Sequence, residues 1–102
     1  MAAITLSSTQ MTRMKTALRT VTTDANLEQE ITDLVNACAI DLTQAGVTDP
    51  DLDDSMIWMA AVTFVRLKFG SPDDYDRLKK AYDEIKAQLG MATGYTTWTA
   101  AL

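Results

Sequence analysis

The sequence contains no histidine and only one cysteine, Cys38, among its 102 residues. Without histidine it can form no Ser/His/Asp triad, no Cys/His dyad and no metal site that needs an imidazole ligand. One cysteine cannot form an internal disulfide or a cysteine-cluster zinc site. The four glycines are isolated from one another, so there is no glycine-rich phosphate-binding loop. We therefore expect neither an enzyme nor a bound cofactor.

Long apolar runs and targeting signals are also missing. The most apolar segment, residues 56–69, is too short to span a bilayer and contains Arg66 and Lys68. The first ten residues have neither the basic start nor the apolar stretch of a secretory signal peptide. We expect a protein that is made and kept in the cytosol, without a membrane partner, where a lone cysteine stays reduced.

What the chain does have is an ordinary globular composition with segregated charge. Apolar residues make up 47% and charged residues 23%, which suits one domain with one modest core. The formal net charge is −5. The first 19 residues carry only basic charges, at Arg13, Lys15 and Arg19. From there to Arg66 every charge is acidic: Asp24, Glu28, Glu30, Asp33, Asp41, Asp49, Asp51, Asp53 and Asp54.

This segregation has two interpretations. The acidic and basic segments form complementary faces that meet between copies of the chain, or the acids form a solvated face that keeps a monomer soluble. The sequence alone leaves both open.

Apolar spacing predicts four helices and no strand, and hence a small all-α bundle. The expected helices span residues 8–20, 26–45, 51–69 and 72–89, followed by an extended tail over residues 91–102. The third is apolar nearly all round, which is typical of a central buried helix; a buried strand over residues 60–65 is the competing interpretation. The expected core includes Leu34, Trp58, Phe64, Leu78 and Tyr82, together with Met56 and Met59.

Capping residues mark the expected helix ends. The starts are assigned to Ser7 or Ser8, to Thr23 or Asp24, to Asp49 before Pro50, and to Ser71 before Pro72. Gly46 and Gly90 are expected to stop the second and fourth helices.

Two sequence features suggest a calcium site or a reactive thiol, but structural roles explain them better. Alternating acids from Asp49 to Asp54 resemble a calcium loop, but an EF-hand needs glycine at its sixth position and glutamate at its twelfth, where this chain has Asp54 and Ala60. A capped helix start accounts for these acids. Cys38 lies on the apolar stripe of its helix, so we expect a buried structural thiol.

The C-terminal half carries a family resemblance. Residues 56–70 read MIWMAAVTFVRLKFG, residues 71–89 read SPDDYDRLKKAYDEIKAQL, and residues 91–96 read MATGYT. This order of a buried helix, Phe-Gly, Pro-Asp-Asp-Tyr, Leu-Lys-x-x-Tyr-Asp, Gln-Leu and Thr-Gly-Tyr resembles the small head–tail connector proteins of long-tailed phages. The resemblance covers roughly residues 10–97.

The resemblance implies a structural virion protein, with residues 1–90 as a helical connector domain. Such proteins form a ring of about a dozen copies between the portal protein and the next connector or tail protein. DNA passes through the channel without sequence-specific binding. The protein would assemble in the host cytoplasm and end at the head–tail junction of the virion.

Two sets of residues follow as candidate sites. The uncharged tail would dock on the portal through Met91, Thr93, Gly94, Tyr95, Thr96 and Trp98. Subunit-interface or channel surfaces would include Arg13, Lys15, Arg19, Glu28, Glu30, Asp33 and Asp41. The competing interpretation is a small cytosolic acidic adaptor or inhibitor that binds one protein partner through its tail or its acidic surface.

Overall fold

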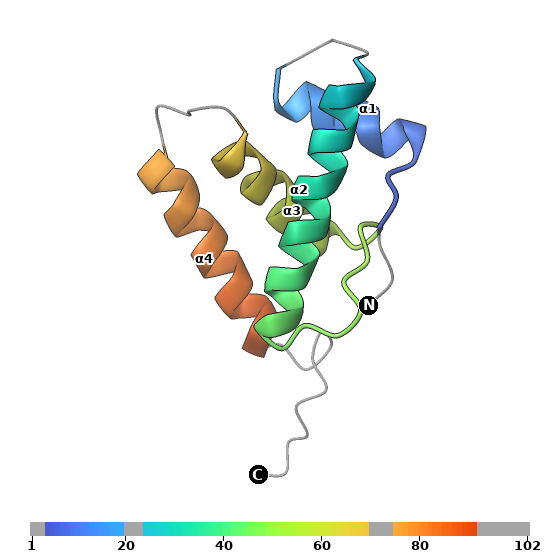
Figure 1. Cartoon of the computed structure of the whole chain (residues 1–102). Helices are drawn as coiled ribbons and strands as arrows, with labels where there is room; N and C mark the ends of the chain where they lie inside the picture. Colours follow the sequence, from blue (N-terminus) through green and yellow to red (C-terminus); the bar gives the residue numbers. More distant parts are fainter. Residues whose placement is uncertain (1–3, 20–23, 70–74, 92–102) are drawn as a thin grey trace.

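The computed structural model describes residues 4–19, 24–69 and 75–91, and over these ranges the regular structure is helical. The helices are α1 (Ser8–Ala17), α2 (Ala25–Gln44), α3 (Ser55–Lys68) and α4 (Tyr75–Met91). Figure 1 shows α2, α3 and α4 side by side, with α1 across the end at which α2 begins. The expected all-α bundle is confirmed.

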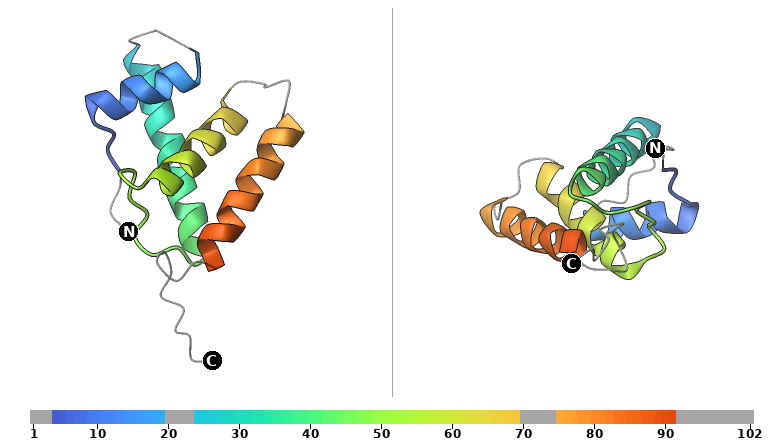
Figure 2. Two further views of the ribbon diagram at one scale, coloured as in Figure 1. Left: turned by 180° about the vertical axis from the view of Figure 1, so that it is seen from behind. Right: turned by 90° about the horizontal axis from the view of Figure 1, so that it is seen from below.

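Helix α3 is the centre of the packing, because it contacts each of the other three helices. It is helical throughout residues 60–65, where a strand was the alternative. The left view of Figure 2, seen from behind, shows α3 between α2 and α4. Its buried side chains join those of the other helices in one core: Met14, Ile31, Val35, Cys38, Leu42, Val47, Leu52, Ile57, Trp58, Ala60, Ala61, Phe64, Val65, Tyr82 and Leu89.

Most of the expected core residues are buried. The Phe64 and Tyr82 rings meet edge to face, with centroids 5.2 Å apart, and Trp58 and Leu78 are also buried. Leu34 is partly buried at the margin of the core. The expectation for Met59 was wrong: its side chain is 52% exposed, because α3 turns one narrow stripe toward solvent.

Three helix ends follow the capping signals. Ser7 and Gln10 form a reciprocal capping box at the start of α1. Asp24 begins α2 by accepting a hydrogen bond from the Asn26 N–H at 2.8 Å. At the end of α2, Gly46 has φ 106°, and the next N–H donates to the Leu42 carbonyl at 3.0 Å. This is the Schellman arrangement that favours glycine.

The start of α3 differs from the expectation. Asp49 does not cap it: that residue has φ 46°, outside the extended conformation that an N-cap adopts. The chain instead makes a turn in which the Asp54 N–H donates to the Asp51 carbonyl at 3.0 Å, and Leu52 inserts into the core. Asp54 is the actual cap, with its carboxylate accepting from the N–H groups of Met56 and Ile57. Core burial of Leu52 therefore overrides the Asp-Pro start signal.

The outer helices also end at other residues than expected. Helix α1 ends at Ala17 rather than near residue 20. Helix α4 continues through Gly90 to Met91, so Gly90 does not stop it. Ser71 and Pro72 lie outside the described residues.

Gly90 has a packing role instead. A Cβ atom built at this position would lie 2.8 Å from the carbonyl oxygen of Ala45, because the last turns of α2 and α4 lie against each other (Figure 1). Only a residue without a side chain fits this approach.

Gly90→Ala is therefore expected to lower the free energy of unfolding by about 1–3 kcal/mol, the usual cost of overpacking. The sign of this change is informative, because helix propensity alone would make the alanine variant about 1 kcal/mol more stable. Urea unfolding followed by circular dichroism measures the change. The exposed position Ala87 on the same helix is the control, where glycine should cost about 1 kcal/mol from helix propensity alone. A more stable Gly90→Ala variant would contradict the close approach.

Candidate interaction surfaces

The basic residues of the first segment are largely engaged within the chain. The Arg13 guanidinium carbon lies 4.4 Å from the centre of the Trp58 ring, a cation–π contact that joins α1 to α3. Lys15 forms an ion pair with Glu28 of α2, and the lysine side chain is only 12% exposed. Arg19, just after α1, is exposed with φ 57°. The expected basic patch is thus mainly a set of contacts that hold α1 to the bundle.

The acids of α2 divide into engaged and exposed groups. Glu28 is paired with Lys15, and Asp41 is bonded to two residues of α4. Glu30 is exposed, and Asp33, also exposed, accepts a hydrogen bond from Gln29 at 2.9 Å. Of the acids proposed for an interface or a channel, Glu30 and Asp33 remain turned to solvent.

A polar cluster ties α2 to α4 around Asp41. The Tyr82 hydroxyl donates to the Asp41 carboxylate at 2.6 Å, and the Lys86 ammonium donates to the same oxygen at 3.2 Å. The Cys38 sulfur lies 3.8 Å from the Tyr82 hydroxyl oxygen. Because the tyrosine proton points to Asp41, the thiol is the donor in that contact. Sequence reasoning placed Asp41 and Tyr82 in different roles, whereas the fold brings them together.

Burial controls the ionisation of this cluster. Removal from water, which disfavours the thiolate, raises the pKa of Cys38 to about 12, and the nearby Asp41 charge adds to this. Burial, followed by the hydrogen bond to Asp41, also raises the pKa of the Tyr82 hydroxyl. Cys38 therefore stays a protonated, structural thiol at neutral pH.

The raised pKa of Cys38 predicts a loss of stability at alkaline pH. A thiol ionises near pH 8.5 in the unfolded chain but only near pH 12 in the fold, so its contribution is complete below about pH 8.5 and is lost above it. We expect the free energy of unfolding to fall by up to about 1.4 kcal/mol per pH unit between these values. Urea titrations at pH 8 and 10 measure the slope. Cys38→Ala is the matched variant, and an equal slope in both proteins would refute the prediction.

The acids at residues 49–54 serve the loop and the helix start. The Asp51 carboxylate accepts from the Asp53 N–H at 3.0 Å, and Asp54 caps α3. Within the described ranges, no group of three or more acidic or cysteine side chains is arranged to hold a metal ion. These contacts give Asp51 and Asp54 structural roles that do not require calcium.

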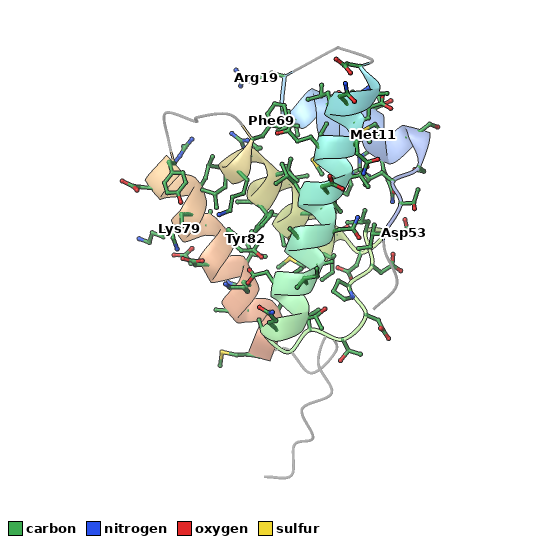
Figure 3. The ribbon with its side chains drawn as sticks, viewed as in Figure 1. Met11, Arg19, Asp53, Phe69, Lys79 and Tyr82 are labelled. Carbon is green, nitrogen blue, oxygen red and sulfur yellow. The ribbon has the colours of Figure 1, made fainter. Side chains whose placement is uncertain are left out.

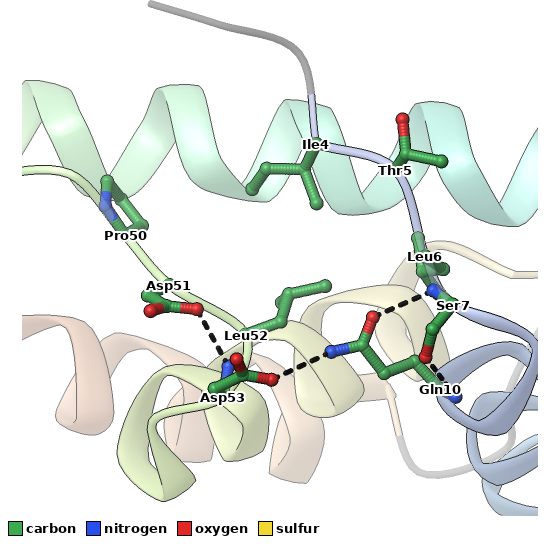
Figure 4. A pocket seen from close by; sticks show the side chains of 9 residues that line it. All are labelled: Ile4, Thr5, Leu6, Ser7, Gln10, Pro50, Asp51, Leu52 and Asp53. Atoms are coloured by element: carbon green, nitrogen blue, oxygen red, sulfur yellow. Dashed lines mark hydrogen bonds between the residues drawn. The ribbon is translucent and has the colours of Figure 1, made fainter.

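A groove separates this loop from the N-terminal segment, as Figure 4 shows. It has a volume of about 470 Å³ and is half apolar and half polar in character, with Ile4, Leu6 and Leu52 facing Gln10, Asp51 and Asp53. Gln10 closes one side by donating to Asp53 at 3.3 Å.

Asn36 of α2 fixes the segment that forms this groove. Its side-chain amide donates to the Ile4 carbonyl at 2.9 Å and its oxygen accepts from the Ile4 N–H at 2.7 Å. Sequence reasoning missed this residue, because a polar residue on a helix gives no sign of which distant main chain it binds.

A second groove lies between α3 and α4, with a volume of about 280 Å³. Three lysines line it beside aromatic rings: Lys68, Lys79 and Lys86 with Phe64, Tyr75 and Tyr82. Figure 3 shows Lys79 at this edge of the bundle, with Asp53 at the opposite edge. The spacing of the lysines along the sequence gave no indication of this groove, because Lys68 belongs to a different helix from the other two.

The expected docking tail lies almost wholly outside the described residues. This applies to Thr93, Gly94, Tyr95, Thr96 and Trp98. Met91, the last residue of α4, is 84% exposed, so α4 presents an apolar side chain to solvent where the tail begins.

These features define a small helical protein whose distinctive parts are surfaces and grooves. None of the helices in the described ranges combines the length and apolar character that a bilayer crossing requires.

A family model described as phage connector protein matches residues 11–96, and the chain belongs to that family. This confirms the resemblance to head–tail connectors and identifies a structural component of the phage virion. Searches of curated proteins and of solved structures return no match.

Proposed function

We propose that this protein is one subunit of a ring that joins the portal protein to the next connector or tail protein, with DNA passing through the channel. The observation that carries the proposal is the match to the phage connector family, which spans all but the first three residues of α1 and the other three helices in full. About a dozen copies are expected by resemblance to that family. We further propose that the chain reaches the virion after assembly in the host cytoplasm.

We assign Glu30 and Asp33 to the channel. Both carboxylates are exposed on α2, and neither forms an ion pair with a described residue. A negatively charged lumen repels DNA phosphates, so the duplex slides through without adhering to the wall. Four other candidate residues have intrachain contacts, and we assign them to holding the subunit together: Arg13, Lys15, Glu28 and Asp41. Arg19 is exposed and remains a candidate interface residue.

The tail from Met91 to Trp98 is the segment that we assign to the portal. It is uncharged and carries Tyr95 and Trp98, residue types enriched in protein interfaces. It follows Met91, the last residue of α4, whose side chain is exposed.

The test is binding of the full-length chain to the portal protein of the same phage. The two purified proteins are mixed, separated by sedimentation and imaged by electron microscopy; we expect a ring of this chain bound to the portal. A chain that stays monomeric and does not bind the portal would contradict the proposal and favour the adaptor interpretation. A ring map with Glu30 and Asp33 on its outer wall would refute the channel assignment alone.

A further inference from the structure

The groove between α3 and α4 has the chemistry to bind carboxylates. Lys79 forms an ion pair with Asp83 at 2.9 Å, and Lys86 forms one with Asp41 at 3.2 Å. Lys68 is exposed, and its ammonium lies 5.7 Å from the centre of the Phe64 ring. Among the described residues no carboxylate pairs with Lys68. The groove therefore has positive charge that no acid in the described ranges neutralises, next to aromatic side chains.

The loop before α3 has the opposite character. Asp49, Asp51 and Asp53 are exposed, while Leu52 between them is buried and anchors the loop. No lysine or arginine of the described ranges forms an ion pair with these three acids. The loop thus presents three carboxylates on a fixed support.

The two surfaces lie on opposite sides of the subunit. In Figure 3 Asp53 is at one edge, and Lys79 is at the other. One chain cannot join them, but two neighbouring copies can, each offering its loop to the groove of the next. A contact between two different faces repeats from copy to copy and closes a ring when the rotation is right.

We propose that the α3–α4 groove of one copy binds the acidic loop of residues 49–53 of a second copy, with Lys68 and Lys79 facing Asp51 and Asp53. This inference rests on the proposed ring and identifies its subunit contact. Opposite charges on the two faces also set the direction of assembly, since loop against loop or groove against groove would place like charges together.

The experiment uses two charge-reversed full-length variants. Variant one carries Lys68→Glu and Lys79→Glu; variant two carries Asp51→Lys and Asp53→Lys. All four side chains are exposed, and circular dichroism checks that each variant is folded. Sedimentation velocity over a concentration series measures self-association. Arg66→Glu with Lys80→Glu is the control, with the same charge change as variant one at exposed side chains that do not line the groove.

We expect each variant alone to self-associate at least about 100-fold more weakly than wild type, since its contact sets like charges against each other. An equimolar mixture should assemble again, because each variant supplies the charge that the other needs. Native mass spectrometry should show equal numbers of the two variants in that assembly. The mixture has the mean net charge of wild type, so general repulsion does not explain the loss and recovery.

Unchanged assembly of either variant, failure of the mixture, or equal loss in the control would overturn the inference. A wild-type chain that remains monomeric at every concentration would also overturn it. That result is distinct from failure of the proposed function, which the binding of wild type to the portal decides separately.

Discussion

Trp58→Ala is expected to lower the free energy of unfolding by about 3–5 kcal/mol, the cost of deleting a large buried aromatic side chain. Trp58 belongs to α3, which contacts every other helix, and it is only 9% exposed. The Arg13 guanidinium lies over its ring, so the substitution also removes the cation–π contact that holds α1 to α3. Since small domains have about 5–15 kcal/mol of stability in total, we expect a large fraction of it to be lost.

Two controls separate the contributions. Arg13→Ala removes the cation–π contact and leaves the tryptophan, and should cost about 0.5–1 kcal/mol. Trp58→Phe keeps an aromatic ring at the site and should fall between the two. Urea unfolding of the three variants at neutral pH gives the order. A loss below about 1 kcal/mol for Trp58→Ala would mean that this side chain packs against a neighbouring subunit instead of its own core.

The fold was predictable because its signals are local. The 3–4 spacing of apolar residues and the capping residues Ser7, Asp24 and Gly46 act within one or two turns, and each appears in the structure in its expected role. The errors arose where a distant contact overrides a local signal. Leu52 is buried in the core, so α3 begins at Ser55 rather than at residue 51. The approach of Ala45 requires a glycine at position 90 inside α4.

The interaction surfaces were less predictable for the same reason. Charge segregation along the sequence suggested a free basic patch in the first 19 residues, but Lys15 folds back onto Glu28 and Arg13 onto Trp58. The groove with the most distinctive chemistry joins Lys68 to the lysines of α4, and only the packing of α3 on α4 creates it. A list of charges cannot show which of them the fold neutralises.

The same separation of core and surface predicts the effect of removing the tail. Deletion of residues 92–102 is expected to leave the bundle folded and to abolish binding to the portal. The deletion point keeps α4 whole, since that helix extends through Met91. The described residues up to Met91 supply one connected core, the helix caps and the Asp41–Tyr82–Lys86 cluster. The deleted segment contains Tyr95 and Trp98 and no charged side chain.

Co-sedimentation with the portal protein measures binding, and circular dichroism with urea unfolding measures the fold. Tyr95→Ala with Trp98→Ala in the full-length chain is the finer variant, because aromatic side chains dominate binding energy in most protein interfaces. Thr99→Ala, just beyond the segment assigned to the portal, is the matched control. We expect the aromatic variant to lose binding as the deletion does, and the threonine variant to retain it. A truncated chain without helical circular dichroism would place the tail in the core, and a folded one that still binds the portal would locate the docking surface on the helices.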